Sequence, residues 1–335
     1  MSPAEYIKQK ALDLGFDLVG ITDTAPLDNK HFKILTDWLA LGCAGRMDYM
    51  KKNLDKRTNP AKLLENARSV ICVALNYNPP MPSSSLRASQ SDARQSHPQQ
   101  QAEPMGTVAN YARYEDYHSF IKRQLQELVS FVSSAVEDDF KFKICVDSAP
   151  LAERALATRA GLGFIGKNHI LINPVLGPQL LLGEIITTLK LPVDRPIADS
   201  CSNCNNCIKA CPTGALTADG RFDANKCISY LTIEYKGRIP DDLAEKIGDR
   251  LFGCDQCVLV CPFHKNAPVC KNKQFKFYPD RAKLNLHQIL ALTKESFETK
   301  FTDSPLKRLT LDCLKRNARV CLANAAQQVA AQPAD

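Results

Sequence analysis

Eight cysteines between positions 201 and 261 constrain this chain more than any other feature of its sequence. The first run reads Cys-x2-Cys-x2-Cys-x3-Cys-Pro and consists of Cys201, Cys204, Cys207 and Cys211. The second run reads Cys-x2-Cys-x3-Cys-Pro and consists of Cys254, Cys257 and Cys261. Thiolates at every third position let one tight loop hold three corners of a cubane, and the first spacing is that of bacterial two-cluster ferredoxins. The pattern therefore predicts two 4Fe-4S clusters.

The two cysteine runs are expected to exchange ligands, because the fourth cysteine of such a run ligates the other cluster. The second run lacks a third closely spaced cysteine, since position 251 is Leu251. Cys227 is nearer along the chain than Cys270 and is expected to fill that place. One predicted ligand set is Cys201, Cys204, Cys207 and Cys261. The other is Cys211, Cys227, Cys254 and Cys257.

Two other uses of cysteine fit the pattern poorly. A zinc site needs one or two Cys-x2-Cys pairs, which leaves the longer run unexplained. A disulfide framework is typical of small secreted domains, whereas this chain has 335 residues and no recognisable export signal. Reduced thiols and a cytoplasmic location are therefore expected. The six remaining cysteines lie mostly in apolar surroundings and are predicted to be core residues.

Composition indicates a multidomain protein that carries its positive charge at one end. A hydrophobic content of 44% supports two or three domains, and no apolar run approaches the length of a membrane span. From Lys265 to the end, thirteen Lys and Arg residues face six Asp and Glu residues, so this tail carries the whole net charge of +7. Such a tail favours a polyanionic partner, although a solvated helical face explains charge alone equally well.

Hydrophobic patterning predicts an α+β protein with a mixed sheet. Helices are expected at 2–14, 31–41, 116–136 and from Leu151 onwards, and strands at 17–22, 67–78, 140–147, 169–174 and 179–189. Short amphipathic helices are expected at 285–292, 294–301 and 305–325. The Pro-, Ser- and Gln-rich segment 79–104 is predicted to be a disordered insertion. The expected domains are 1–190, 191–268 with both clusters, and 269–335.

Chemistry outside the clusters is expected at two places. Asp147 ends an apolar strand just before a turn and a helix, where desolvation can raise the pKa of a carboxyl and make it a general acid. The alternative is that Asp147 or Ser148 caps the next helix. The glycine-dense segment 161–168 lets backbone approach a ligand closely, although such a loop is often only a tight turn. The common nucleotide-binding glycine motifs are missing from the sequence.

Together these motifs resemble the epoxyqueuosine reductase family. The resemblance rests on DSAPLAERALATRAGLGFIGKN, CSNCNNCIKACPTGAL, FGCDQCVLVCPFHKNAP and YARYEDYH, which agree in order and spacing. It covers nearly the whole chain apart from 79–104. It implies an oxidoreductase that reduces the epoxide of epoxyqueuosine to queuosine at the tRNA wobble position. It also implies a base-off cobalamin in an N-terminal domain similar to that of reductive dehalogenases, reduced through the two clusters.

The resemblance also implies roles for particular residues. Asp147 matches the proposed proton donor of the family. Matching positions that line the cobalamin are Arg57, Tyr111, Gly163, Lys167 and Ile170, together with the candidate neighbours His118 and His169. Asn110 stands where the family is expected to have a basic residue, which puts that part of the pocket in doubt.

The resemblance implies partners as well. Family members end in HEAT-like helical repeats that hold the anticodon stem-loop, and this chain stops after about one repeat. The predicted phosphate contacts on its last helix are Lys307, Arg308, Lys315, Arg316 and Arg319. A low-potential donor such as flavodoxin or ferredoxin is expected to supply electrons. The protein is expected to be a monomer with no membrane contact.

Two other functions are compatible with a pair of clusters. One is a cobalamin-dependent reductive dehalogenase that acts on a small molecule, but such enzymes commonly carry a twin-arginine signal and use a tyrosine as proton donor. The other is a non-catalytic ferredoxin-like subunit that transfers electrons, which the 200 residues before the clusters argue against. Loss of epoxyqueuosine reduction in a deletion strain tests the first, and corrinoid binding tests the second.

Overall fold

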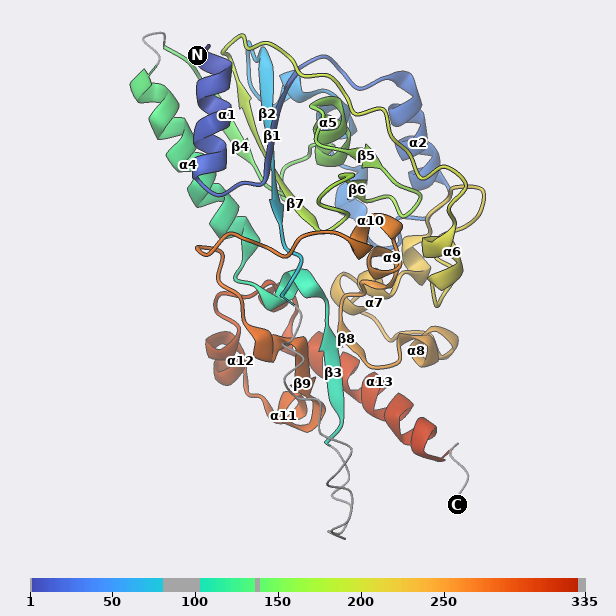
Figure 1. Ribbon diagram of the computed structural model, residues 1–335. Coiled ribbons are helices and arrows are strands. Elements are labelled where there is room, and N and C mark those ends of the chain that lie inside the picture. Colours follow the sequence, from blue (N-terminus) through green and yellow to red (C-terminus); the bar gives the residue numbers. More distant parts are fainter. Residues whose placement is uncertain (1, 81–102, 136–138, 331–335) are drawn as a thin grey trace.

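The computed structural model describes residues 2–80, 103–135 and 139–330. The predicted insertion at 79–104 therefore lies largely outside the described residues. Figure 1 shows a sheet with flanking helices at one end of the molecule, the C-terminal helices at the other, and short helices of the cysteine region beside both. No helix in the described part of the chain is both long and apolar enough to cross a membrane.

The main sheet has four strands in the order β1-β2-β7-β4. They are β1 Leu18–Asp23, β2 Ser69–Asn76, β7 Leu180–Thr187 and β4 Phe142–Cys145. Every residue of β2 is buried, which agrees with its continuous apolar sequence. All three strand pairs are antiparallel, so the expectation of a mixed sheet is wrong for this domain. The α+β class is confirmed.

Helices cover both faces of this sheet (Figure 1). On one face, α1 Pro3–Asp13 and α4 Tyr117–Ala135 pack their buried residues against Ile71, Val73 and Ile185. On the other face, α5 Glu153–Arg159 packs beside the alternate residues of β2. Because side chains alternate across a strand, one buried strand supplies both cores. Helix α1 begins at a capping box formed by Ser2 and Glu5.

The segment after α5 contributes its strands to two different sheets. Strand β5 Phe164–Ile165 pairs with β6 Leu171–Ile172 in a separate two-stranded sheet, whereas β7 joins the main sheet. Gly163 must lack a side chain here, because an added Cβ would lie 2.3 Å from the backbone oxygen of Ile172. This loop stands between the main sheet and the cysteine region.

The cysteine region consists of short helices joined by loops. They are α6 Asn206–Ala210, α7 Ile228–Ile233, α8 Asp241–Ile247, α9 Gln256–Leu259 and α10 Pro262–Lys265. Helices α6 and α9 lie side by side, which brings the two cysteine runs together. Helix α2 Asn29–Ala40 reaches this region through Trp38, whose indole donates a hydrogen bond to the Phe222 carbonyl at 2.7 Å.

A second, mixed sheet joins distant parts of the chain in the order β8-β3-β9. Strand β3 Met105–Val108 is parallel to β8 Arg250–Phe252 and antiparallel to β9 Lys283–Asn285. The C-terminal helices α11 Leu286–Ala291, α12 Lys294–Lys300 and α13 Leu311–Ala330 pack on this sheet and on α7. The tail thus shares a hydrophobic core with the cysteine region, and the expected HEAT-like repeat is not confirmed.

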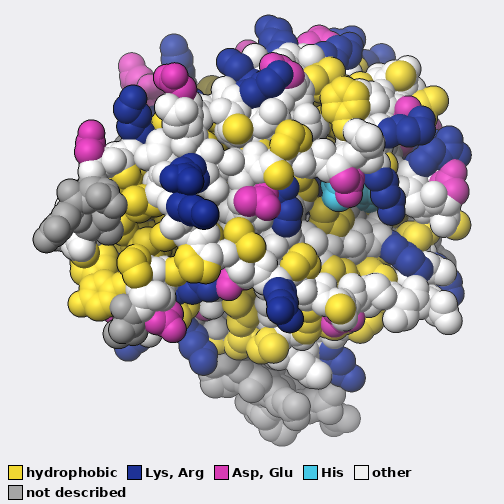
Figure 2. All heavy atoms as spheres, turned by 90° about the horizontal axis from the view of Figure 1, so that it is seen from above, with side chains coloured by type: hydrophobic (Ala, Val, Ile, Leu, Met, Phe, Trp, Pro, Cys, Tyr) yellow, Lys and Arg dark blue, Asp and Glu magenta, His cyan; other side chains and the backbone are white. Residues whose placement is uncertain are grey.

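The remaining short elements connect these layers. They are α3 Leu54–Thr58 and the 3-10 turns Asp48–Lys51, Pro60–Lys62, Asn110–Arg113, Ala224–Lys226, Pro279–Ala282 and Pro305–Arg308. Figure 2 views the molecule from the end that carries the main sheet. On that face, basic and acidic side chains are interspersed with apolar ones, and no large patch of one charge is visible.

One buried amide is among the contacts that hold helix α13 to the cysteine region. Asn317 donates hydrogen bonds to the carbonyls of Thr232 at 2.8 Å and Leu251 at 3.0 Å. Replacing Asn317 with Ala leaves both buried carbonyls without this donor, so we expect a loss of about 1–3 kcal/mol in unfolding free energy. Anaerobic urea unfolding measures this loss. The control Arg319→Ala, on the exposed side of α13, should stay within about 0.5 kcal/mol; an equal effect of both changes would contradict the proposed anchor.

Candidate functional site

The first group of cysteines surrounds one cavity. Cys201, Cys204, Cys207 and Cys261 line it together with Asn168, Ile172, Asn206, Pro262 and Phe263. Two of these cysteines come from the loop before α6, one from α6 itself, and the fourth from the start of α10. The four thiols that the spacing assigned to one cluster are therefore brought together across 60 residues of sequence.

The second group of thiols gathers nearby. The charge of Cys254 acts on the pKa of both Cys227 and Cys257, and Cys211 acts on both Cys227 and Cys254. Cys270 lies elsewhere: its side chain contacts Tyr114, and its backbone N–H donates to the Asn78 carbonyl at 2.7 Å. The structure thus places Cys227, rather than Cys270, with the second group.

Asp147 sits directly beyond β4 in a strained conformation. Its φ of 54° places it in the left-handed region, which non-glycine residues rarely adopt. Its backbone N–H donates to Glu153 Oε1 at 2.6 Å, which ties the strained residue to the start of α5. The residue before α5 is Ala152, which provides no side-chain cap. Capping therefore does not explain Asp147.

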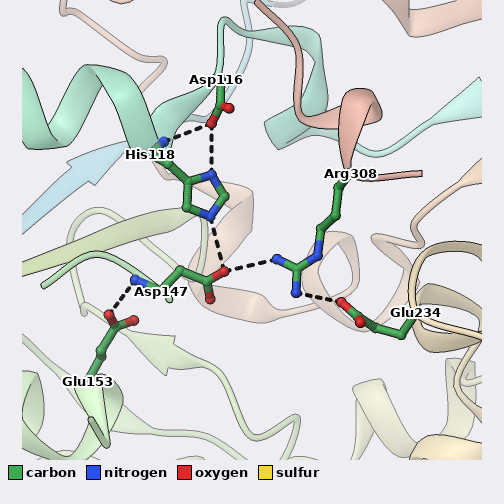
Figure 3. Close-up of polar contacts among 6 residues, drawn as sticks. All are labelled: Asp116, His118, Asp147, Glu153, Glu234 and Arg308. Carbon is green, nitrogen blue, oxygen red and sulfur yellow. Dashed lines mark hydrogen bonds and ion pairs between the residues drawn. The ribbon is translucent and has the colours of Figure 1, made fainter. Parts of the chain in front are cut away.

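The carboxylate of Asp147 is the centre of a polar network (Figure 3). Its Oδ2 accepts hydrogen bonds from His118 Nε2 at 3.1 Å and from Arg308 Nη1 at 3.0 Å. The other ring nitrogen of His118 lies 2.8 Å from Asp116 Oδ1. Arg308 also pairs with Glu234 Oε1 at 2.7 Å. The start of α4, the end of β4, the end of α7 and the C-terminal tail thus meet at one carboxylate.

This network sets the charges in the site. The hydrogen bond from His118 is the main cause that lowers the pKa of Asp147 to about 2; burial opposes it, and Arg308 adds to it. Burial alone would lower the pKa of His118, but its bonds with Asp116 and Asp147 raise that pKa to about 9. The expectation of a raised pKa for Asp147 is therefore wrong for this arrangement. At neutral pH the proton resides on the imidazole of His118.

Behind Asp147 lies a pair of buried carboxyl groups. Glu184 lies on β7, and neither of its oxygens has a partner among the described residues. Its strand neighbours are Cys72 and Cys145, which offer no strong donor. Burial raises the pKa of Glu184 well above its ordinary value, and burial also raises that of Glu153 to about 7. Burial and, after it, the nearby charge of Glu153 both favour the neutral form of Glu184.

Tyr111 connects the Asp147 network to the second group of cysteines. Its ring lies 6.0 Å from Phe252 and 6.1 Å from Tyr117, and burial raises its pKa above the ordinary range. The charges of both Asp147 and Asp255 act on it. Asp255 stands between two cysteines of the second group and accepts the backbone N–H of Asn110 at 2.6 Å.

Arg57 and His169 were also predicted to line the cofactor. Arg57 lies near the network, because its carbonyl accepts the Ala152 N–H at 3.1 Å, but its guanidinium donates to the carbonyls of Tyr49 and Lys52. The backbone carbonyl of His169 accepts a hydrogen bond from Arg154. The buried Nε2 of His169 has no partner among the described residues, and burial lowers its pKa, so the ring is neutral.

The predicted glycine loop lies against the first group of cysteines. The backbone N–H of Lys167 donates to Cys201 Sγ at 3.4 Å, and Asn168 lines the cavity. The Ile170 carbonyl accepts the Gly166 N–H at 3.0 Å, which closes the turn. Gly163 is explained by its packing on β6.

Some basic residues of the tail are used within the fold, and others are free of ion pairs among the described residues. Lys307 and Arg308 lie in the 3-10 turn Pro305–Arg308, so their predicted place on the last helix is wrong. Arg316 donates to the carbonyls of Leu231, Tyr235 and Gly237 at 2.6–2.8 Å, so it is used within the fold. Among the described residues, Lys307, Lys315 and Arg319 have no ion pair, and Lys307 and Arg319 are exposed.

Sequence reasoning missed several members of the site. These are Glu234, Asp116 and Glu153, which contact the network. Tyr49 is another, because the charges of the network act on its pKa. Asp116 carried a weak signal, since it stands two positions before His118 in the YARYEDYH segment. Glu234 carried none, because only the fold brings it to Arg308.

The charge assignment predicts an unusual titration of His118. We expect its imidazole to titrate near pH 9, and at a lower pH in Asp147→Asn, because a carboxylate partner is lost. Its raised pKa contributes stability that is complete below about pH 6.5 and is lost as pH rises through about 9. The lowered pKa of Asp147 contributes stability above about pH 3.8 that is lost as pH falls through about 2.

The check is NMR titration of histidine-labelled protein, with His118→Gln to assign the resonance. A His118 resonance that titrates near pH 6.5 in the wild type would contradict the network.

The cysteine grouping predicts that Cys227 and Cys270 are not equivalent. Cys227→Ser should lower the iron content after anaerobic reconstitution by about half, because one of two clusters loses a ligand. Cys270→Ser is the matched control and should keep the full content, since it lies against Tyr114. Iron and sulfide analysis with electron paramagnetic resonance measures both. Full iron content in Cys227→Ser and half content in Cys270→Ser would instead make Cys270 the cluster ligand.

The chain is similar to known proteins along most of its length. Residues 200–264 match the family described as "4Fe-4S double cluster binding domain", and residues 57–148 match "Epoxyqueuosine reductase QueG, DUF1730". The chain is 38% identical over 325 residues to the epoxyqueuosine reductase of Pseudomonas aeruginosa, covering 96% of this chain and 85% of the relative.

Solved structures give the same result. The structure of epoxyqueuosine reductase from Streptococcus thermophilus superposes with a TM-score of 0.85 at 30% identity, covering 98% of this chain and 83% of that one. An epoxyqueuosine reductase crystallised with an epoxyqueuosine-modified tRNA-Tyr stem loop has a TM-score of 0.84 at 33% identity, covering 96% and 81%. With its double-cluster domain and this similarity along nearly its whole length, the chain belongs to the epoxyqueuosine reductase family.

Proposed function

We propose that this protein reduces epoxyqueuosine to queuosine at the wobble position of tRNA, with cobalamin as a second cofactor and Asp147 as the proton donor. The observation that carries the proposal is the position of Asp147. Its carboxylate is bonded to a charged imidazole, and Tyr111 lies within reach of both that carboxylate and Asp255, beside the second group of cysteines. A proton source and an electron source are therefore close together.

The chemistry requires both sources. Converting an epoxide to an alkene consumes two electrons and two protons and releases the oxygen as water. Iron–sulfur clusters deliver electrons singly and reach potentials as low as ~−700 mV, which suits a poorly reactive epoxide. Electrons enter at the two cysteine groups, which lie side by side on α6 and α9. A low-potential flavodoxin or ferredoxin is the kind of donor that matches them.

The residues around Asp147 fit a large cofactor in several respects. Asp147 and Arg308 are each 42% exposed although the surrounding protein desolvates them, as expected on a concave wall. The neutral His169 ring presents a buried nitrogen without a partner among the described residues, which suits an amide of the corrin periphery. Tyr111 and His169 would hold the cofactor. Cobalamin, when bound, supplies a strongly reducing metal centre next to the substrate.

Asp147 delivers the proton, and His118 stores it. At neutral pH the imidazolium holds a proton at Nε2, 3.1 Å from Asp147 Oδ2. As negative charge develops on the departing epoxide oxygen, one proton passes from Nε2 to Oδ2 and then to that oxygen. The second proton follows the same route after solvent reprotonates His118, so the oxygen leaves as water. Asp116 holds the other ring nitrogen and orients the imidazole. The tie from Asp147 N–H to Glu153 keeps the carboxylate pointed at His118.

The tail would supply phosphate contacts. Lys307 and Arg319 are exposed, and Lys315 is half-buried, so their charges remain available to a polyanion. Arg308 brings the tail directly to Asp147, which couples the candidate nucleic-acid surface to the catalytic carboxylate. The expected substrate is the anticodon stem-loop that carries epoxyqueuosine.

The test is the turnover of Asp147→Asn on epoxyqueuosine-modified tRNA. Asparagine cannot accept and release the proton, so turnover should fall by ~10²–10⁴-fold while tRNA binding persists. Nucleoside mass spectrometry follows queuosine formation, and fluorescence anisotropy follows binding. Asp241→Asn, an exposed aspartate that begins α8, is the control and should keep full turnover. Full activity of Asp147→Asn would remove Asp147 from the mechanism.

A further inference from the structure

Lys167 makes an unusual set of contacts for a lysine near the protein surface. Its ammonium donates to the carbonyls of Ser202 at 3.1 Å and Cys204 at 2.9 Å, and to Asn205 Oδ1 at 2.9 Å. A lysine ammonium has three donors, so this group is fully satisfied by one short loop. That loop is the segment that carries the first two cysteines of the first group.

We propose that Lys167 is a positioning residue for the first 4Fe-4S cluster: it fastens the loop 201–205 and raises the reduction potential of that cluster. The inference deepens the proposed function by assigning control of the electron supply to a residue that is not a ligand. It rests on the assignment of the first cysteine group to a cluster and is independent of the role of Asp147.

The cysteine loop needs a fastening from outside. Ser202 has a φ of 45°, a left-handed conformation that is unfavourable for a non-glycine residue unless its surroundings hold it. The loop's own backbone bond runs from the Cys204 N–H to the Cys201 carbonyl at 2.9 Å. The ammonium of Lys167 binds the carbonyls of Ser202 and Cys204 from the other side. The strained turn is thus held between its own bond and Lys167.

The backbone of the same segment reaches the sulfur itself. The Lys167 N–H donates to Cys201 Sγ at 3.4 Å. Gly166 makes this approach possible, because an added Cβ would lie 2.4 Å from Ile172 Cδ1 and 3.3 Å from Cys201 Sγ. Asn168, within the turn, and Ile172, on β6, line the cavity of this cysteine group. The glycine-dense segment therefore forms one wall of the cluster site.

These contacts should all raise the reduction potential of the first cluster. Reduction adds a negative charge to the cluster, and hydrogen bonds to the sulfurs and nearby positive charge both favour the reduced form. The ammonium is bound to the carbonyl of Ser202, which follows Cys201, and to the carbonyl of Cys204 itself. Its charge therefore lies beside the cluster. Removing it should make the first cluster harder to reduce and leave the second cluster unchanged.

The experiment compares Lys167→Met with Lys209→Met. Lys209 is exposed on α6, in the same cysteine run, and its ammonium has no hydrogen-bond partner among the described residues. Both changes remove one positive charge near the first group, but only the first removes the fastening of the loop. Lys167→Arg keeps the charge and several donors and should restore most of the wild-type behaviour.

The readout is the midpoint potential of each cluster, measured without tRNA by redox titration and electron paramagnetic resonance on anaerobically reconstituted protein. In Lys167→Met we expect the ratio of reduced to oxidised first cluster at a fixed potential to fall about tenfold, a shift of ~59 mV for a one-electron couple. Lys209→Met should shift it much less. If Lys167→Met instead loses half of its iron while circular dichroism shows unchanged secondary structure, that result also supports the fastening role.

Unchanged potentials and iron content in Lys167→Met, or equal shifts in Lys167→Met and Lys209→Met, would overturn the inference. If Lys167→Met does not fold, Lys167→Gln takes its place, because glutamine also removes the positive charge but keeps a polar side chain; an unchanged first-cluster potential and iron content in that variant would contradict the inference. Since no tRNA is present, these results do not depend on Asp147. A failure of the Asp147→Asn test would leave them intact.

Discussion

The convergence of eight thiols from three separate stretches of chain is the constraint on which the rest of the structure depends. The two groups require α6 and α9 to lie side by side and require the start of α7 to reach them with Cys227. These helices are too short to be stable alone. They are held by the core that the cysteine region shares with β3 and the tail, in which Leu251 and Phe252 are fully buried.

The network around Asp147 is organised by charge. Asp147 receives Arg308 from the tail and His118 from the start of α4. Residues 161 positions apart thus meet at a single carboxylate. This arrangement brings the end of β4, the start of α4 and the basic tail together at one carboxylate. It also explains why a strained residue persists at position 147, since several partners fix both its backbone and its side chain.

Much of the architecture followed from local patterns. The continuous apolar run at 67–78 predicted the buried strand β2, and the amphipathic period at 116–136 predicted α4. The predicted mixed sheet is wrong, because the main sheet is antiparallel throughout, and the sequence did not show that β6 pairs with β5 in a separate sheet. Strand partners are chosen by tertiary packing, which short apolar runs do not encode.

The sequence by itself determined the two cysteine groups, because ligand spacing within a tight loop is a local property, and it singled out Asp147 by its place after a strand. Only the tertiary structure decided the charge of that carboxylate. Burial in isolation would raise its pKa, whereas His118 and Arg308 lower it, and both partners arrive from distant segments. The fold likewise makes Arg308 and Arg316, which were expected to contact phosphates, partners within the protein. It also brings the ammonium of Lys167 to the loop 201–205. Electrostatics depend on distances between side chains, and those distances exist only after the chain has folded.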